Sequence, residues 1–158
     1  MERFPSLQDS GIKREDNRGW LQVLYESDTM VLKRSFSRKG VFRGLHVQLP
    51  PTPQVKLIRV VSGRIIDFLV SMNDPDRVIH HKTLGPAEDW VRIGSEYAHG
   101  FYALEDTVFE YVCDGGYNEA GELAFSITDY LKDEMGLADA ILSAKDLASP
   151  PLKQVHNG

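Results

Sequence analysis

The sequence has one cysteine, Cys113, among its 158 residues, so no disulfide can form within the chain. Apolar runs are short, and none approaches the ~20 residues that a helix needs to cross a bilayer. The N-terminal segment lacks the apolar core of a signal peptide. These absences predict a cytoplasmic protein with no membrane partner. Nothing around Cys113 is typical of a catalytic thiol or a zinc ligand, and we interpret it as a small apolar side chain.

Positive charge is also scarce, because 18 Lys and Arg stand against 23 Asp and Glu, for a formal net charge of −5. Proteins that bind nucleic acid usually carry a basic surface, so we expect no nucleic-acid partner. A phosphate-bearing ligand would be held by a few well-placed cations. The length fits one compact domain, which we expect to span residues 1–158, with 152–158 as a loose tail.

Short segments rich in Val, Ile, Leu, Phe and Tyr alternate with Gly, Pro and Asp about every ten residues, which is typical of strands and turns. The expected strands are 20–26, 30–37, 44–48, 54–62, 64–71, 80–84, 89–93, 99–103, 108–114 and 124–128. This rhythm predicts an all-β barrel or jelly roll rather than a βαβ fold. Two short helical segments are expected near the C-terminus, at 129–136 and 142–146.

Residues 40–48 (Gly-Val-Phe-Arg-Gly-Leu-His-Val-Gln) place Arg43 and His46 on one predicted strand. Residues three apart on a regular strand point to opposite faces. Both side chains can therefore serve one site only if Gly44 allows the strand to bulge or twist. Taken alone, a histidine in a strand is more often structural than catalytic.

Lys56 shares a strand face with Ile58 and Val60 in the segment 54–63. A lysine aligned with aliphatic side chains needs a ligand or a partner if that face is buried. The alternative is an exposed edge strand, on which the charge protects against aggregation.

Three more side chains are candidates on local grounds. His99 precedes a glycine and stands among aromatic residues. Tyr111 lies on the same face as Phe109 and Cys113, which by itself predicts core packing. Asp146 lies in a segment where an aspartate is usually a helix cap or exposed to solvent.

The sequence resembles the dTDP-4-dehydrorhamnose 3,5-epimerase family over about residues 14–150. Five segments match in the family's order: 16–19 (Asp-Asn-Arg-Gly), 37–46 (Ser-Arg-Lys-Gly-Val-Phe-Arg-Gly-Leu-His), 56–63 (Lys-Leu-Ile-Arg-Val-Val-Ser-Gly), 98–101 (Ala-His-Gly-Phe) and 142–146 (Leu-Ser-Ala-Lys-Asp). The specific part is Arg-Gly-Leu-His, followed ten residues after its histidine by Lys-Leu. The resemblance implies a cupin-type β-barrel, a homodimer and a reaction that needs no cofactor and no metal.

The resemblance also implies the catalytic roles. His46 matches the family's base, and a histidine has an ordinary pKa of about 6.5, which suits proton removal near neutral pH. Asp146 matches the carboxylate that orients this base and stabilises its imidazolium form. Lys56 matches the cation near the C4 oxygen, where an enolate forms. Tyr111 matches the acid that returns a proton from the opposite face.

The remaining matches imply how the substrate, a nucleotide-diphospho-4-keto sugar, is bound. Arg18 and Arg43 match positions that grip the diphosphate, where a planar guanidinium can bind in a bidentate manner. His99 matches a residue in contact with the substrate, and Gln48 is assigned to the same group. Tyr117 is expected to flank the nucleotide base.

The sequence departs from the family pattern at several positions. Lys33 replaces the usual Asn, Val55 replaces the usual Gly before Lys-Leu, and residues 94–97 replace Pro-x-Gly-Phe. Residues 20–24 lack the second aromatic residue and the Glu, and 135–141 is shortened, without the Trp-Pro element. Because the catalytic set survives, we expect the chemistry to be retained. The substrate stays open between dTDP-, GDP- and CDP-linked 4-keto sugars.

Five other functions are weighed against these features. A metal-dependent cupin is disfavoured, because Gln48 stands where a second ligand would follow His46, and His80 and His81 are adjacent and read as surface residues. A 3,4-ketoisomerase would move the ketone instead, and a single-centre epimerase could use every residue named above. A non-catalytic sugar-nucleotide binding module would not need the full catalytic set. An NAD-dependent reductase is disfavoured, since no G-x-G-x-x-G follows a strand.

Overall fold

The computed structural model describes residues 13–115 and 121–152, so the expected loose tail lies, except for Leu152, outside the described residues. The strands are β1 (Lys13–Asp16), β2 (Gly19–Glu26), β3 (Met30–Ser37), β4 (Phe42–Gln48), β5 (Val55–Ser62), β6 (Ile65–Ser71), β7 (Ile79–Leu84), β8 (Val91–Ile93), β9 (Tyr97–Ala103), β10 (Thr107–Asp114) and β11 (Glu122–Ala124). The helices are α1 (Thr128–Asp133) and α2 (Ala144–Leu147).

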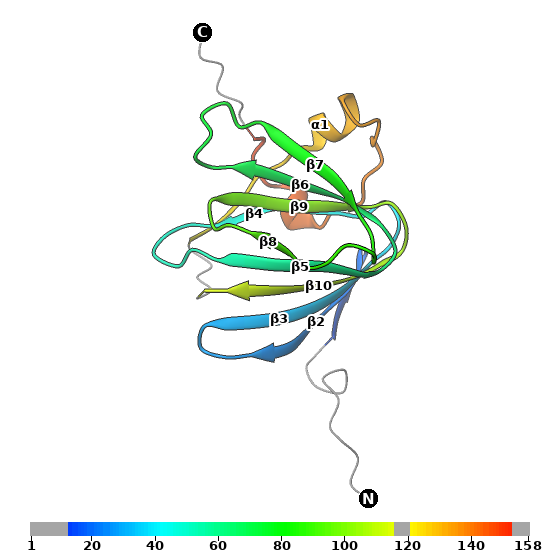
Figure 1. Cartoon of the computed structure of the whole chain (residues 1–158). Coiled ribbons are helices and arrows are strands. Elements are labelled where there is room, and N and C mark those ends of the chain that lie inside the picture. Colours follow the sequence, from blue (N-terminus) through cyan, green and yellow to red (C-terminus); the bar gives the residue numbers. More distant parts are fainter. Residues whose placement is uncertain (1–12, 116–120, 153–158) are drawn as a thin grey trace, which may run out of the picture.

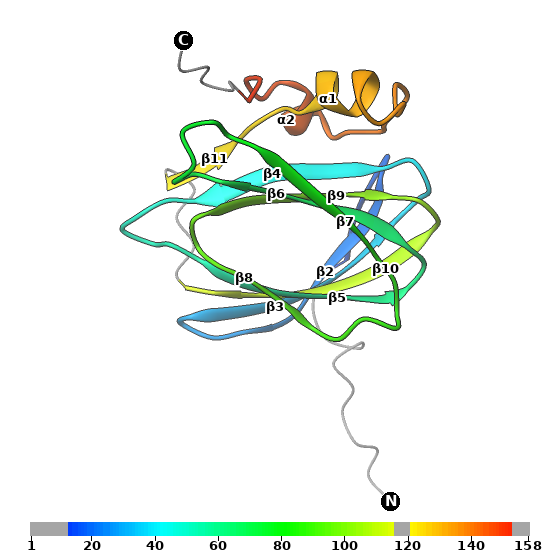
Figure 2. The ribbon, with the colours of Figure 1, turned by 45° about the horizontal axis from the view of Figure 1, so that its top comes forward.

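The strands form two antiparallel sheets that face each other around a central space (Figure 2). The six-stranded sheet has the order β1-β2-β3-β10-β5-β8, and the five-stranded sheet has the order β11-β4-β9-β6-β7. Figure 1 shows β10 lying between β3 and β5, in the middle of the larger sheet. The prediction of an all-β barrel with short C-terminal helices is confirmed.

Two groups of buried apolar side chains hold these layers together. One includes Ile58, Ile65, Phe101 and Phe109, which come from both sheets and pack in the space between them. The other includes Phe42, Leu45, Phe68, Leu131 and Leu142, and it joins the outer side of the five-stranded sheet to the C-terminal segment. Figure 2 shows α1 and α2 covering this side. The central strands of this sheet, β4, β9 and β6, are therefore largely buried on both faces, which explains the apolar run of β6.

Local differences from the prediction have simple causes. β1 was not predicted, because Lys13–Asp16 consists of four exposed charged residues that are strand only through their pairing with β2. The segment predicted as a strand at 124–128 is split, since β11 ends at Ala124 and α1 begins at Thr128. Neither helix in the described part of the chain is long and apolar enough to span a membrane.

Candidate active site

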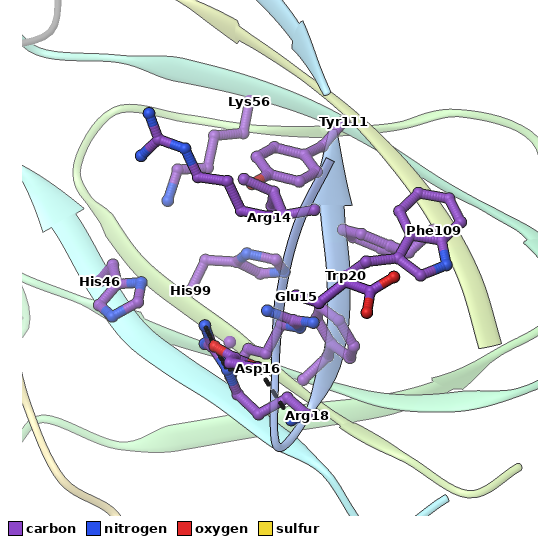
Figure 3. Close-up of a pocket in the computed structure, with 14 residues that line it drawn as sticks. Arg14, Glu15, Asp16, Arg18, Trp20, His46, Lys56, His99, Phe109 and Tyr111 are labelled. Carbon is purple, nitrogen blue, oxygen red and sulfur yellow. Dashed lines mark hydrogen bonds and ion pairs between the residues drawn. The ribbon is translucent and has the colours of Figure 1, made fainter. Parts of the chain in front are cut away.

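The inner faces of the two sheets enclose a cavity of about 380 Å³ (Figure 3). Its lining includes His46 and His99 from the five-stranded sheet, and Lys56 and Tyr111 from the six-stranded sheet. A second cavity, of about 430 Å³, shares His46, Lys56 and Tyr111 and extends past Lys33. We call this second cavity the Lys33 lobe. The three shared side chains therefore stand where the two cavities meet.

His46 is hydrogen-bonded to a buried carboxylate. Its Nε2 lies 2.7 Å from Oδ1 of Asp146, whose side chain is 1% exposed. Oδ2 of Asp146 accepts a second hydrogen bond, from the backbone N–H of Gly44 at 3.1 Å. Burial alone would favour the neutral acid, but the hydrogen bonds from His46 and Gly44 and the charge of His46 outweigh it and lower the pKa of Asp146. With an ionised Asp146 accepting from Nε2, the other ring nitrogen of His46, Nδ1, is the basic one.

The position of Asp146 is fixed by the start of α2. Ser143 is the N-cap residue, and its hydroxyl accepts the N–H of Asp146 at 3.1 Å. An aspartate in such a segment is usually a helix cap or exposed to solvent, but Asp146 is neither.

Gly44 allows Arg43 and His46 to line the same cavity. The register of β4 against β9 shifts between these two residues, so the condition that their spacing sets for a shared site is met. Gly44 has φ of 115°, and a Cβ there would lie 2.7 Å from the Cα of Gly100 and from the carbonyl oxygen of His99. Only glycine fits, because β4 and β9 approach so closely.

Lys56 lies on an interior strand. β5 pairs with β10 on one side, where Lys56 is opposite Cys113. It pairs with β8 on the other side, where Lys56 is opposite Ile93. The edge-strand interpretation of Lys56 is therefore wrong. Burial lowers the pKa of Lys56, because removal from water disfavours its charged form.

Tyr111 projects from the middle of β10 into both cavities. Its ring packs against Phe109, with the ring centroids 5.7 Å apart, so it contributes to the core while facing the cavities. Burial raises the pKa of Tyr111 well above that of an ordinary tyrosine, which keeps the phenol neutral and able to donate a proton.

His99 also has a carboxylate partner, which sequence reasoning missed. Nε2 of His99 lies 2.6 Å from Oδ1 of Asp67, and these two side chains are 8% and 5% exposed. A signal was present, since Asp67 interrupts the apolar run of β6 (Ile-Ile-Asp-Phe-Leu-Val). A buried aspartate needs such a partner.

Arg43 and Arg18 also line the first cavity, and both are held by hydrogen bonds. Arg43 donates to the hydroxyl of Ser37 at 2.8 Å and to the carbonyl oxygen of Phe36 at 3.1 Å. Burial and the nearby charge of Arg18 lower the pKa of Arg43 to about 10. Arg18 is paired with Asp16, at 2.6 Å, so its charge is balanced locally.

The other predicted contacts lie elsewhere. Gln48 lines the Lys33 lobe and donates to the hydroxyl of Thr52 at 3.1 Å. Tyr117 lies outside the described residues. His80 and His81 are exposed on β7, as predicted. Within 13–115 and 121–152, no group of three or more His, Cys, Asp and Glu is arranged to hold a metal ion.

Proteins similar to this chain are found among characterised enzymes and among solved structures. An enzyme named dTDP-4-dehydrorhamnose 3,5-epimerase from Mycobacterium tuberculosis is 33% identical over 139 residues, which cover 82% of this chain and 68% of that protein. The crystal structure of an enzyme with the same name from Sulfolobus tokodaii matches with a TM-score of 0.66 and 31% identity, over 88% of this chain and 85% of that one.

A third relative was solved with a ligand. The dTDP-6-deoxy-D-glucose-3,5-epimerase from Legionella pneumophila, in complex with dTDP-4-keto-L-rhamnose, matches with a TM-score of 0.63 and 27% identity, over 89% of this chain and 84% of that one. The family model for dTDP-4-dehydrorhamnose 3,5-epimerase matches residues 12–154. This chain therefore belongs to the dTDP-4-dehydrorhamnose 3,5-epimerase family and is an epimerase.

Proposed function

We propose that this chain epimerises a nucleotide-diphospho-4-keto sugar at C3, C5 or both, by proton removal and return through an enolate, without a cofactor. The observation that carries this proposal is the placement of His46 and Tyr111. They project into one cavity from two different sheets, with Lys56 beside Tyr111 on the larger sheet. A sugar between the sheets would meet a base on one face and an acid on the other.

The chemistry follows from these positions. Nδ1 of His46 removes the proton next to the ketone, and Asp146 stabilises the imidazolium that results. The electron pair of the broken C–H bond forms the C=C bond of the enolate. The π pair of the ketone moves onto its oxygen, where the ammonium of Lys56 stabilises the negative charge. The neutral phenol of Tyr111 then donates its proton to the opposite face of the carbon. The ketone re-forms and the centre is inverted.

Arg43 and Arg18 supply the cations for the diphosphate. Arg43 is already held by Ser37 and the backbone, so little conformational freedom is lost when it binds an anion. Arg18 would exchange part of its pairing with Asp16 for a phosphate. His99, fixed by Asp67, would contact the sugar. The dTDP-linked sugar is the first substrate to test, because the similar enzymes are named for dTDP-linked sugars. The GDP- and CDP-linked sugars are tested next, because this sequence departs from the family pattern at several positions.

The experiment is incubation of the protein with dTDP-, GDP- and CDP-linked 4-keto-6-deoxy sugars in deuterated water. Mass and NMR spectra report which carbon takes up deuterium and which centre inverts. We expect exchange and inversion at C3, C5 or both with the wild type, and neither with His46→Asn. Exchange retained in His46→Asn would remove His46 from the role of base. A product with its ketone at C3 would instead identify a 3,4-ketoisomerase, and binding without exchange would identify a binding module.

We also propose that the protein is a homodimer that associates through the outer face of the six-stranded sheet. Leu32, Val112 and Leu57 are aligned across β3, β10 and β5 on this face, and each is half-buried. The buried carboxylate of Glu110 lies on the same face. Light scattering during size exclusion should give the mass of a dimer, and Val112→Asp should give a monomer.

The compartment we propose is the cytoplasm, because the single cysteine is a free, buried thiol.

A further inference from the structure

The Lys33 lobe contains a lysine that the mechanism above does not use. Lys33 lies on β3, directly opposite Tyr111 in the pairing of β3 with β10. Its Nζ is 5.6 Å from the centroid of the Tyr111 ring. An ammonium within about 6 Å of an aromatic centroid is attracted to the π-electrons of that ring. Lys33 is also one of the positions at which the sequence departs from the family pattern.

The two lysines of the larger sheet have different neighbours. Lys56 is opposite Cys113, one inward-facing position along β10 from Tyr111, whereas Lys33 is opposite Tyr111 itself. Both line the Lys33 lobe, together with Tyr111. Lys56 can therefore interact with the ketone oxygen while Lys33 remains in contact with Tyr111.

Resting on the proposed epimerisation, we propose that Lys33 is a positioning residue for proton return. Its ammonium, held beside the Tyr111 ring, stabilises the phenolate that forms when Tyr111 gives its proton to the sugar. In this step the O–H bond of Tyr111 breaks and a C–H bond forms on the sugar. The electron pair of the O–H bond stays on the tyrosine oxygen, and solvent later returns a proton to it.

The surroundings of Tyr111 explain why a cation is needed there. Burial disfavours the phenolate, and it is the largest cause of the raised pKa of Tyr111. The other ionisable groups that act on Tyr111 come from several elements: Cys113 on β10, Arg43 on β4, Arg18 before β2, and Glu122 on β11. Cys113 and Glu122 oppose a phenolate, and the two arginines are committed to the diphosphate. Lys33 is the cation of the larger sheet that lies against the Tyr111 ring, whereas Lys56 is occupied by the enolate.

The test compares Lys33→Met, which removes the charge but keeps the length of the side chain, with Lys33→Arg, which keeps the charge. Deuterium exchange reports proton removal by His46, and inversion reports proton return, with the same three nucleotide sugars as probes. In Lys33→Met we expect kcat for inversion to fall about tenfold, KM and the exchange rate to stay within about twofold, and the solvent isotope effect on inversion to rise. Lys33→Arg should recover most of the rate. Lys132→Met, on the exposed surface of α1, is the matched charge control and should behave as wild type.

Two further results decide whether Lys33 acts through Tyr111. In a Tyr111→Phe background, the added Lys33→Met change should lower inversion less than twofold, because no phenolate forms. A tenfold loss that persists in this background would overturn the inference. So would a higher KM with unchanged kcat, an equal loss of exchange and inversion, or wild-type rates in Lys33→Met. A wild-type protein that neither exchanges nor inverts any of the three sugars would instead overturn the proposed function, and this inference with it.

Discussion

His46 and Asp146 are 100 residues apart in the sequence, yet Nε2 of the histidine lies 2.7 Å from Oδ1 of the aspartate. The contact crosses layers of the fold, because His46 lies on β4 and Asp146 lies in α2, which covers the outer side of the same sheet. The backbone N–H of Gly44 binds the second carboxylate oxygen, so one aspartate fixes both the imidazole and the bulge that orients it. In the proposed mechanism, α2 therefore carries the carboxylate that orients the base.

Asp146→Asn should slow deuterium exchange into the sugar by about 10²-fold or more, because a carboxamide no longer favours the tautomer with a basic Nδ1 and cannot stabilise the imidazolium. The measurement is the rate of exchange in deuterated water, with NMR of labelled imidazole nitrogens to report the tautomer of His46. Asp129→Asn, exposed in the first turn of α1, is the control. An exchange rate within threefold of wild type would mean that Asp146 only supports the structure.

Tyr111→Phe should slow inversion by about 10²-fold or more while exchange stays within about threefold, because His46 can remove and return a proton on its own face without an acid opposite. Both rates come from one reaction, followed by mass spectrometry and NMR. Tyr102→Phe is a suitable control, since Tyr102 is a half-buried tyrosine packed against the other core cluster. Equal losses of exchange and inversion in Tyr111→Phe would indicate a role in binding or packing.

The sequence was sufficient for the architecture, and several of the residues that it singled out line the two adjoining cavities. Short segments rich in β-branched and aromatic residues, with turn signals about every ten residues, predicted the strands. The expected bulge at Gly44 brings Arg43 and His46 into one cavity, because a glycine in a strand marks close backbone approach. The gathering of His46 with Lys56 and Tyr111 came from the family resemblance, since strand spacing alone left each residue with a structural alternative.

What the sequence did not reveal depends on register and on long-range contacts. Lys33 lies over Tyr111 only because β3 and β10 pair in one particular register. Asp67 contacts His99 because β6 and β9 are neighbouring strands. The residues next to Asp67 in the sequence do not indicate this partner. β1 has no apolar pattern, because it forms an exposed edge of the larger sheet.

Glu110→Gln should lower the free energy of unfolding by about 2–4 kcal/mol, since it leaves two arginines without their shared carboxylate. Glu110 accepts from Arg34 at 2.9 Å and from Arg59 at 2.6 Å, with its side chain 6% exposed. Burial opposes its ionisation, but these hydrogen bonds outweigh burial and lower the pKa of Glu110. Its contribution to stability is therefore present at neutral pH and is lost as pH falls through this lowered pKa.

Urea unfolding of wild type and Glu110→Gln at neutral pH measures this loss. The matched control is Glu105→Gln, because Glu105 faces Arg64 at 3.8 Å with both side chains 57% exposed, and such a surface pair contributes at most about 0.5–1 kcal/mol. Equal effects of the two substitutions would contradict a special role for the buried carboxylate.

Lys56 should set an alkaline limit on turnover that lies below the pKa of an ordinary lysine. Burial lowers the pKa of Lys56, and the ammonium form is the one that stabilises the enolate, so kcat/KM should fall as pH rises through this lowered pKa. Burial and the charge of Arg18 also lower the pKa of Arg43, to about 10. Lys56→Arg distinguishes the two groups, because it changes only the alkaline limit that is set by residue 56. Lys56→Met should lower turnover by about 10²-fold at neutral pH and abolish that limit. An unchanged alkaline limit in Lys56→Arg would assign it to Arg43 and leave Lys56 with a role in binding alone.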